Sequence, residues 1–406
     1  MSHPVLIIGG GIGGITAALE LAEAGKEVVL VEREPYLGGN VSRFNNYFPK
    51  MCPPACGLEI NYQRIRANPR ISYYTGTTIT GLTGSEGNFE VTLHRAPQLI
   101  NDRCTACGLC AGVCPEKRSV PLGMNVNEKA AYLPGGVPFP MKYTIDEEVC
   151  LKEACGRCVD VCDVGAIRLD AEPVDMEMKV HALVIATGWH LYDVSKIENY
   201  GYSDEPDVVT NLELEYMLAA SGSAHTGLAR PSDGSSPERI AFVQCAGSRD
   251  LHHLPYCSAV CCSASIKHAL TLSERYPGIS TEIFYIDLRL TGRNEKLLRK
   301  AEQCGTISMT KGKVGRISRE GQGDRLYVEV EDVMSGKKRS EAFDLVVLAA
   351  GLVPNHLPID LPAGGDGFYM AGEIAGIYPA GSCKRPMDVA STVRDATSAS
   401  LKTMHQ

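Results

Sequence analysis

Short apolar runs that end in glycine-containing turns are spread along the chain, and they predict parallel strands buried on both faces. Near the amino terminus, Val5–Ile8 predicts such a strand, the stretch 15–24 predicts a helix, and 28–31 predicts the next strand. This order is that of a βαβ unit. A second unit that begins with such a strand is expected near residue 239, with 240–243 as its first strand.

The first βαβ unit carries the glycine fingerprint of a dinucleotide-binding fold. Gly9, Gly11 and Gly14 satisfy G-x-G-x-x-G directly after the strand, and Glu32 closes the second strand, where a carboxylate accepts hydrogen bonds from a ribose. Glycine lets the backbone approach a pyrophosphate at the positive end of the following helix. The motif predicts an FAD or NAD site, since both share it; a packing turn is the alternative.

Segments far from the fingerprint favour FAD. Residues 368–373 are expected to form a short strand that ends in Gly-Glu, followed by a helix from about 387 to 400. This arrangement resembles FAD-dependent proteins of the pyridine nucleotide-disulfide reductase type, and two further strand-ending turns match the same family. The FAD contacts that the resemblance implies are Gly9, Gly11, Gly13, Gly14, Glu32, Arg33, Gly39, Asn40, Ala186, Thr187, Gly188, Gly351, Gly372 and Glu373.

Composition narrows the classes of protein further. With 406 residues, 44% of them hydrophobic, the chain can bury the cores of two or three domains. A net charge of −8 without a long basic run argues against nucleic-acid binding. No apolar stretch is long enough to cross a bilayer and no secretory signal is visible, so we expect a cytoplasmic location. Sixteen cysteines then indicate metal ligation or redox chemistry, because the cytosol keeps thiols reduced.

Eight cysteines form two ferredoxin-like motifs. The first, starting at Cys104, has the bacterial spacing C-x2-C-x2-C-x3-C-P without a departure, whereas the second, starting at Cys150, has four residues in its first gap. We expect two [4Fe-4S] clusters in which the fourth cysteine of each motif ligates the other cluster. The ligands are then Cys104, Cys107, Cys110 and Cys162 for one cluster, and Cys150, Cys155, Cys158 and Cys114 for the other. Zinc, the alternative, usually takes two C-x2-C pairs at one site.

A third set of four cysteines occupies the second nucleotide-binding-like unit. Where a second G-x-G-x-x-G motif for NAD(P)H would follow the strand at 240–243, only Gly247 remains, so the backbone cannot approach a pyrophosphate in the same way. The segment instead carries Cys245, Cys257, Cys261 and Cys262. These thiols either ligate a third cluster or are buried free cysteines of a core.

The residues around the third set resemble the flavin subunit of heterodisulfide reductase. The similarity covers the strings 244–250, 256–267 and 287–292. It implies FAD, a third [4Fe-4S] cluster on the four cysteines, and a catalytic Lys267 near the flavin, whose cation would stabilise the reduced flavin. Without the resemblance, a lysine on this helix is more simply a solvated side chain.

Within that family the chain most resembles the A subunits of quinone-interacting membrane-bound oxidoreductase complexes, because no further ferredoxin domain follows its insertion. This implies a hetero-oligomer, dimerised or not, that contacts the inner face of the membrane only through QmoB-like and QmoC-like subunits. Electrons would pass from menaquinol to adenylylsulfate reductase, and bifurcation at the flavin stays open. Two other functions stay open as well, an NAD(P)H-dependent disulfide reductase that uses Cys52 and Cys56, and a scaffold with structural clusters.

The predicted fold class is α/β: an FAD-binding Rossmann-like fold of the pyridine nucleotide-disulfide reductase type with a degenerate nucleotide-binding-like domain and a ferredoxin-like insertion. The Gly- and Pro-rich stretch 134–140 inside the insertion is expected to be a surface loop. The expected domains are FAD-binding parts at 1–100, 171–236 and 343–406, the insertion at 101–170, and the degenerate domain at 237–342.

Overall fold

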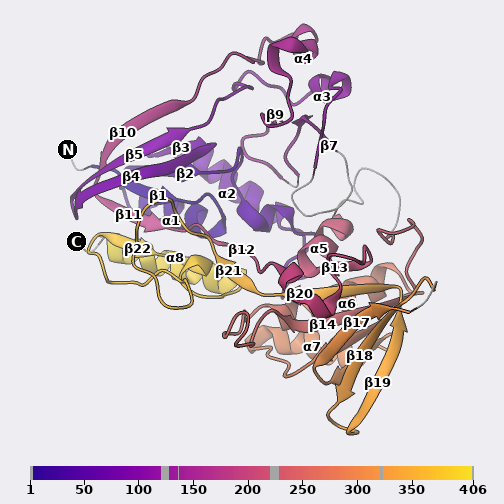
Figure 1. Ribbon diagram of the computed structural model, residues 1–406. Helices are drawn as coiled ribbons and strands as arrows, with labels where there is room; N and C mark the ends of the chain where they lie inside the picture. Colours follow the sequence, from indigo (N-terminus) through magenta and orange to yellow (C-terminus); the bar gives the residue numbers. More distant parts are fainter. Residues whose placement is uncertain (1–2, 120–127, 136, 220–227, 321–322, 405–406) are drawn as a thin grey trace. The chain divides into compact units, whose positions relative to one another are not determined.

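The computed structural model of the chain describes residues 3–119, 128–135, 137–219, 228–320 and 323–404. It divides into two compact units, which can be followed along the chain in Figure 1. The first comprises Met1–Arg43, Pro54–Trp189 and Pro354–Gln406, and the second comprises Phe44–Pro53 and His190–Val353. The domain boundary expected near residue 237 falls inside the second unit, because β13 (Val208–Thr210) belongs to that unit's sheet. None of the described helices is long and apolar enough to cross a membrane.

The first unit is built on a parallel sheet with the strand order β22-β11-β1-β2-β3. Its strands are β1 (Val5–Ile8), β2 (Val28–Glu32), β3 (Ile71–Thr75), β11 (Ala182–Ile185) and β22 (Ile377–Pro379). From β1 the chain proceeds to β2 and β3 on one side, and from β11 it proceeds to β22 on the other. A nucleotide crevice is therefore expected outside the carboxyl ends of β1 and β11.

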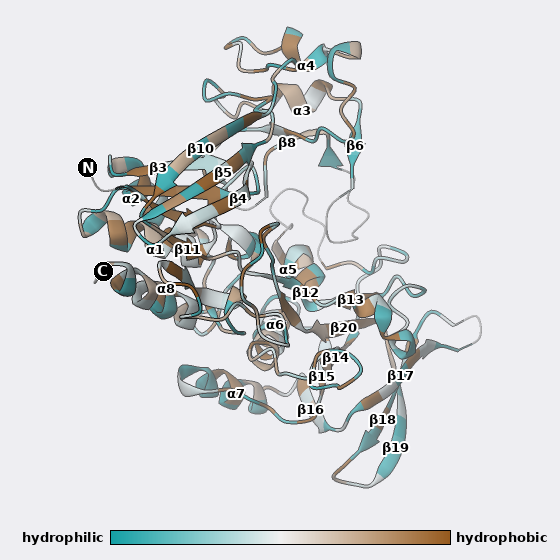
Figure 2. Ribbon diagram, turned by 60° about the vertical axis from the view of Figure 1, so that its left-hand side comes forward, coloured by the Kyte–Doolittle hydropathy of each residue, from teal (hydrophilic) through white to brown (hydrophobic). Residues whose placement is uncertain are grey.

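Side chains of these strands alternate between two cores. One face packs on α1 (Ile12–Glu23), α2 (Ala55–Ala67) and α8 (Val389–Met404), with Ile7 and Leu30 buried among them. The other face packs on an antiparallel sheet of β4 (Thr77–Ser85), β5 (Asn88–Arg95) and β10 (Val174–Val180), with Leu6 and Leu183 buried there. Figure 2 shows in brown the apolar residues along these strands. Burial on both faces is why the strand at 5–8 reads as an uninterrupted apolar run.

The second unit repeats this three-layer architecture. Its parallel sheet has the order β13-β20-β14-β15-β16, with helices on one face and an antiparallel sheet on the other. The central strands are β14 (Arg239–Ala246), β15 (Ser280–Tyr285), β16 (Ile307–Lys311) and β20 (Leu345–Ala350). The covering elements are α5 (Asn211–Ala219), α6 (Cys261–Arg275), α7 (Glu295–Glu302), β17 (Val314–Arg319), β18 (Leu326–Asp332) and β19 (Lys337–Phe343). Short strands β12 (Trp189–Leu191) and β21 (Leu352–Pro354) pair where the chain enters and leaves the unit.

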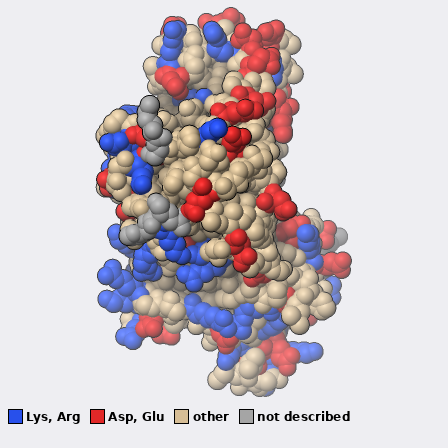
Figure 3. All heavy atoms as spheres, turned by 90° about the vertical axis from the view of Figure 1, so that its left-hand side faces the viewer, with Lys and Arg blue, Asp and Glu red and all other residues tan. Residues whose placement is uncertain are grey.

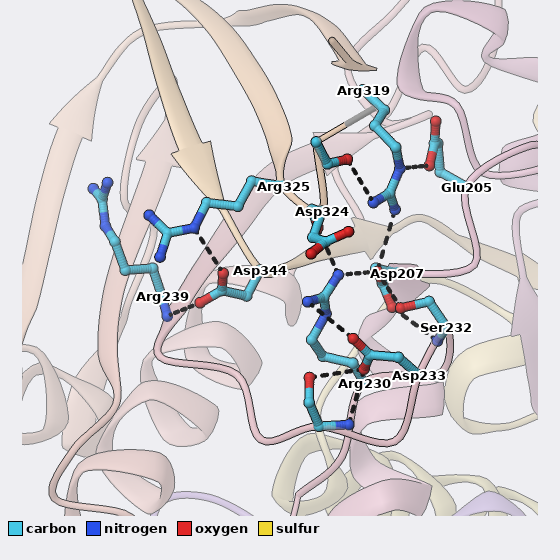
Figure 4. Close-up of polar contacts among 12 residues, drawn as sticks. Glu205, Asp207, Arg230, Ser232, Asp233, Arg239, Arg319, Asp324, Arg325 and Asp344 are labelled. Atoms are coloured by element: carbon cyan, nitrogen blue, oxygen red, sulfur yellow. Dashed lines mark hydrogen bonds and ion pairs between the residues drawn. The ribbon is translucent and has the colours of Figure 1, made fainter. Parts of the chain in front are cut away.

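A buried ion network fixes the start of β13 to the hairpin of β17 and β18 (Figure 4). The fully buried Asp207 accepts hydrogen bonds from Nη2 of Arg230 at 2.8 Å, Nη2 of Arg319 at 3.2 Å and Oγ of Ser232 at 2.8 Å. Burial acts to raise the pKa of Asp207, but the hydrogen bonds from Arg230 and Ser232 hold it below its usual value. Because this carboxylate is fully paired, we assign the network a structural role.

The described residues of the insertion between β5 and β10 form short elements around a small core of their own. These elements are α3 (Leu109–Val113), α4 (Arg157–Asp160), and the strand pairs β6 (Lys117–Arg118) with β7 (Glu128–Lys129) and β8 (Ala131–Tyr132) with β9 (Thr144–Ile145). The described residues of the stretch 134–140 form a loop, as expected, but the expectation that it lies on the surface was wrong. Phe139 is buried and stacks on Tyr62, with 5.0 Å between the ring centroids, so the apolar ring anchors this stretch; residue 136 lies outside the described residues.

Several predicted elements are confirmed, with shifted ends. Helix α1 begins at Ile12 instead of residue 15, because the glycines of the fingerprint form its first turn. Strand β14 extends to Ala246, beyond the expected end at 243. The strand predicted at 368–373 was wrong: these residues form turns apart from one isolated bridge, and the strand that completes the sheet is β22.

Candidate functional site

The loop between β1 and α1 shows what each glycine of the fingerprint does. A Cβ on Gly9 would lie 2.3 Å from the carbonyl oxygen of Ala186, and a Cβ on Gly14 would lie 1.8 Å from that of Gly9, so neither position accepts a side chain. A Cβ on Gly11 would meet only the Cα of Gly39, at 3.9 Å. Gly11 therefore leaves open space beside the helix N-terminus, where a pyrophosphate can approach. The loop fits the phosphates of FAD.

Glu32 ends β2 with its carboxylate turned toward this loop. Its oxygens accept hydrogen bonds from the N–H groups of Gly10 at 2.6 Å and Glu34 at 2.8 Å. Burial raises the pKa of Glu32, and the two N–H groups oppose that shift. A Cβ on Gly39 would lie 2.9 Å from the Cα of Gly11, so the segment after β2 packs directly on the loop. The acid is thus fixed where a ribose-binding carboxylate is expected.

The turn after β11 borders the same crevice. The N–H of Ala186 donates to the carbonyl of Ile8 at 2.8 Å, which ties the turn to β1. Thr187 and Asn355 exchange two hydrogen bonds, each of 2.8 Å. Gly188 has φ +71° and would place a Cβ in open space. These residues therefore keep the carboxyl edge of the sheet rigid and uncovered.

Three other predicted FAD contacts have visible structural partners. Gly13 is buried on α1, and a Cβ there would lie 3.3 Å from the side chain of Thr392 on α8. The amide of Asn40 donates to the carbonyl of Trp189 at 2.9 Å. The exposed side chain of Arg33 forms an ion pair with Glu34, with 3.8 Å between Nε and Oε1. Contact of these residues with FAD stays a prediction.

The closing turn lies elsewhere than the sequence suggested. Gly372 and Glu373 are exposed and precede the amino end of β22, whereas a nucleotide meets the carboxyl end. The residue that follows the carboxyl end of β22 by two positions is Gly381, at φ +73°. Its N–H donates to the carboxylate of Asp395 on α8 at 2.9 Å. Sequence reasoning chose the first Ala-Gly pair of this region and missed the third, at residues 380–381, which directly follows an apolar strand.

Four thiols of the insertion line one pocket. They are the predicted set for one cluster, with one cysteine from the first motif and three from the second: Cys114, Cys150, Cys155 and Cys158. The longer first gap of the second motif contains a short 3-10 turn, Lys152–Ala154, and Cys150 still reaches the pocket. The departure from the ferredoxin spacing is therefore absorbed locally.

The remaining thiols of the insertion pack beside that pocket. Cys104, Cys107 and Cys110 lie close enough to influence one another's charge and that of Tyr143, and Cys162 packs on the same small core. Burial raises the pKa of Cys110 to about 11, and the neighbouring thiols act in the same direction. Such a set becomes thiolate only with a cationic centre among its members, which an iron-sulfur core supplies.

The third set lies at the carboxyl end of β14, beside β20, where this fold binds a nucleotide. A bulge between Val243 and Ala246 interrupts the pairing with β20, and Cys245 adopts φ +60° there. Burial raises the pKa of the Cys261 thiol. All four thiols line one pocket together with Arg249, Asp287 and Arg289: Cys245, Cys257, Cys261 and Cys262.

One cysteine of each set has the same local structure: Cys104, Cys150 and Cys257. Two positions after these cysteines, Ala106, Lys152 and Ala259 have φ values of +58°, +49° and +61°. Their N–H groups point back at the cysteine Sγ atoms, at 3.4, 3.3 and 3.4 Å. Hydrogen bonds to sulfur are one of the factors that set the potential of a cluster. The third set, although it lacks ferredoxin spacing, thus shares this turn with both ferredoxin motifs.

The described residues contain no group of three or more Cys, His, Asp or Glu side chains arranged around a single ion. A cubane does not require one, because its four thiolates bind four different irons and stand further apart than the ligands of one ion. All the thiols of the three sets are free, and none of them forms a disulfide. The three sets therefore fit polynuclear iron-sulfur centres.

Gly351, a predicted FAD contact, packs beside the third set. A Cβ there would lie 2.6 Å from Oγ of Ser248 and 3.3 Å from Oγ of Ser258. These two hydroxyls hydrogen-bond each other at 2.8 Å, and Ser258 also accepts from the N–H of Leu352 at 2.8 Å. The glycine lets the end of β20 approach the cysteine loops. Sequence reasoning missed this role of the serines, and its assignment of Gly351 to FAD stays a prediction.

Lys267 is buried on α6, so the alternative of a solvated side chain was wrong. Its Nζ contacts the carboxylate of Glu215 and donates to the carbonyl of Asn46 at 2.9 Å. Burial lowers the pKa of Lys267 to about 7, whereas the adjacent carboxylate favours the charged amine. Glu215 also accepts a hydrogen bond from the N–H of Asn45 at 2.9 Å. Sequence reasoning missed Glu215, because nothing in its local pattern distinguishes it.

Comparison with known proteins supports an FAD site in the first unit and an iron-sulfur site in the insertion. The sequence model of FAD dependent oxidoreductases matches residues 4–61, and that of 4Fe-4S binding domains matches residues 97–117. The iron-sulfur A subunit of a CoB-CoM heterodisulfide reductase of Methanopyrus kandleri is 37% identical over 421 residues, which are 98% of this chain and 63% of that protein. The A subunit of the ferredoxin/F420H2-dependent CoB-CoM heterodisulfide reductase of Methanosarcina acetivorans is 33% identical over 423 residues, 99% of this chain and 53% of that protein.

Solved structures show the same fold. Thioredoxin reductase of Lactococcus lactis matches with a TM-score of 0.53 at 15% identity, over 99% of this chain and 98% of that one. The thioredoxin reductase of T. acidophilum matches with a TM-score of 0.54 at 13% identity, over the same shares. The chain spans between about half and two thirds of the length of the curated relatives named above. The chain thus has a thioredoxin reductase-like fold, one segment that matches FAD dependent oxidoreductases and one that matches 4Fe-4S binding domains, and it is similar over nearly its whole length to the A subunits of heterodisulfide reductases.

Proposed function

We propose that the chain is an electron-transfer subunit that passes electrons between FAD and three [4Fe-4S] clusters. The observation that carries this proposal is the pocket of Cys245, Cys257, Cys261 and Cys262 at the carboxyl end of β14. In this fold that position belongs to a second nucleotide. FAD exchanges electrons singly or in pairs and clusters exchange them singly, so the two together convert between both modes.

The protein's own residues have separate tasks in this proposal. The loop at Gly11 and the carboxylate of Glu32 bind and orient the dinucleotide. The cysteine sets hold the clusters, and Lys267 is the catalytic residue that faces the flavin. Glu215 holds the Lys267 amine in place through their direct contact. A cation at the flavin would stabilise its anionic reduced form.

For the whole complex we propose a role like that of QmoA, the flavin-binding member of the quinone-interacting membrane-bound oxidoreductase complex. QmoB-like and QmoC-like subunits would connect the chain to menaquinol at the inner face of the membrane, and adenylylsulfate reductase would exchange the electrons in sulfate respiration. The second candidate is a heterodisulfide reductase-type subunit, which the names of the relatives favour. Bifurcation at the flavin is a further proposal within this candidate.

Metal and flavin analysis of anaerobically purified protein tests the cluster proposal. We expect about twelve irons and about one FAD per chain. Replacement of Cys257 by Ala should remove about four irons while FAD stays bound. Eight irons in the unmodified protein, with no change in the variant, would leave the third set without a cluster and contradict the proposal.

The NAD(P)H-dependent disulfide reductase remains a distinct alternative. Cys52 belongs to the second unit and Cys56 is exposed on α2 of the first, and both are free thiols. This alternative predicts that NADH or NADPH bleaches the flavin within seconds and that Cys52→Ser abolishes turnover. Our proposal predicts no bleaching by either nucleotide and the same flavin spectrum in the Cys52→Ser variant.

A further inference from the structure

Basic side chains form an exposed stripe that begins at the third cysteine pocket. Between residues 289 and 300 five residues are basic and only Glu295 is acidic, although the whole chain has a net charge of −8. We call these five exposed residues the cationic stripe: Arg289, Arg293, Lys296, Arg299 and Lys300. Figure 3 shows one face of the molecule, on which Lys and Arg side chains gather toward the lower end.

Most cations of the stripe are free to meet a partner. Lys300 pairs with Glu274 at 2.5 Å, but Arg293, Lys296 and Arg299 make no ion pair or side-chain hydrogen bond with any residue that the structure describes. Residues three positions apart share one face of a helix. The 3-10 turn at 292–294 and α7 therefore place these three cations in one row, while Leu297 buries the opposite face.

A short loop connects the stripe to the cysteine pocket. Asp287 and Arg289 line the pocket with the four thiols, and the thiol of Cys262 donates to the carbonyl of Asp287 at 3.6 Å. Ala259, another residue of the pocket lining, is exposed. An electron carrier bound on the stripe would therefore contact the solvent-facing edge of the third cluster.

We propose that the cationic stripe docks an acidic electron-transfer protein, whose redox centre is rimmed by carboxylates, at the third cluster. This rests on the proposed function, because the cluster gives one electron to the bound carrier or takes one from it, and no further reactant is needed. Complementary charge raises the rate of encounter and fixes orientation. An anionic membrane would also attract these cations, but a membrane-surface helix turns apolar side chains outward. Leu290 and Leu297 are instead buried.

The test measures binding of a plant-type ferredoxin, an acidic carrier, with gallium in place of iron. The full chain with its cofactors is titrated at low and at high salt. We expect the double variant Lys296→Glu, Arg299→Glu to bind at least tenfold more weakly at low salt and to lose the salt dependence. The matched control, Lys337→Glu with Lys338→Glu, reverses two exposed charges on β19 and should bind as the unmodified chain does. Equal binding by both variants would overturn the proposal.

The two proposals fail in different ways. The gallium protein carries no electron, so its binding reports docking alone, while the EPR spectrum of the reduced chain reports the third cluster. If binding depends on the cationic stripe but the EPR spectrum shows no third cluster, the cluster proposal fails and the docking proposal stands. Stripe-dependent sedimentation with phosphatidylserine vesicles, without ferredoxin binding, would assign the stripe to a membrane and overturn the docking proposal.

Discussion

Glycines of the loop after β1 act in two different ways at the level of single residues. Gly9 and Gly14 are required by the protein itself, since a Cβ at either position would collide with backbone. Gly11 has open space around its Cα, so only a bound ligand requires it to be glycine. This difference separates the stability of the fold from the affinity for FAD.

Replacement of Gly11 by Ala should weaken FAD binding without unfolding the protein. The new methyl group has room in the protein but would occupy the space for the pyrophosphate, so we expect at least a tenfold loss of FAD affinity. Flavin fluorescence titration of the apoprotein measures it. The control Gly57→Ala on α2, where a Cβ meets nothing within 4 Å, should keep full affinity. Equal affinity in the Gly11 variant would place the pyrophosphate elsewhere.

Replacement of Glu215 by Gln should leave the buried amine of Lys267 without its counter-charge. Breaking a buried pair on one side costs about 3 kcal/mol, which we expect as the loss in free energy of unfolding at pH 7. Urea denaturation followed by circular dichroism measures it. The control Glu302→Gln, on the exposed face of α7, should change little.

The stability of the Glu215→Gln variant should depend on pH in a defined direction. Burial alone holds the pKa of Lys267 at about 7, below the value of about 10.4 in an unfolded chain. Between these values the unfolded chain binds a proton that the folded chain does not, so stability rises with pH from about 7 to about 10. The loss in free energy of unfolding is therefore largest below pH 7. A free energy of unfolding that does not change with pH would show that Lys267 stays charged for another reason.

At the level of single elements, the spacing of the cysteines predicts the local structure of their sites only in part. The C-x2-C-x2-C-x3-C pattern was enough to identify the insertion, because a tight loop that holds three thiols needs that spacing. The four-residue gap of the second motif could not be resolved until the 3-10 turn at 152–154 was seen to absorb it. The turn shared by Ala106, Lys152 and Ala259 was also invisible in the sequence, because positive φ values at Ala and Lys follow no residue preference.

Cys114 provides the sharpest test at this scale, because it stands in the first motif but lines the pocket of the second. We expect Cys114→Ala to lose the cluster of Cys150, Cys155 and Cys158, with about four fewer irons per chain. EPR during a potential titration should show the other clusters unchanged. Cys162→Ala is the matched variant and should remove the EPR signal of the other cluster of the insertion. Loss of the same signal in both variants would contradict the crossed ligation.

On the scale of the whole molecule, the two units and the insertion differ in what holds them together. Each unit has a parallel sheet between helices and a second sheet, whereas the insertion has a small core into which several thiols pack. Removal of iron under reducing conditions should therefore unfold the insertion while both parallel sheets persist. Hydrogen exchange should show lost protection within 101–118 and 144–169 and retained protection in β1 and β14. Loss throughout β14 would show that the third set stabilises its unit as well.

The sequence by itself determined the local features: the strand, helix and strand of the first βαβ unit, the glycine fingerprint, and the two ferredoxin motifs. These features depend on short-range periodicity and spacing, which residue identity sets directly. Tertiary structure alone decided that Phe139 enters the core of the first unit, that Lys267 is buried against Glu215, and that Gly381 follows the closing strand. It also brought the four cysteines of the third set into one pocket, which spacing alone had left open, because the end of β14 and the start of α6 meet only when the sheet assembles.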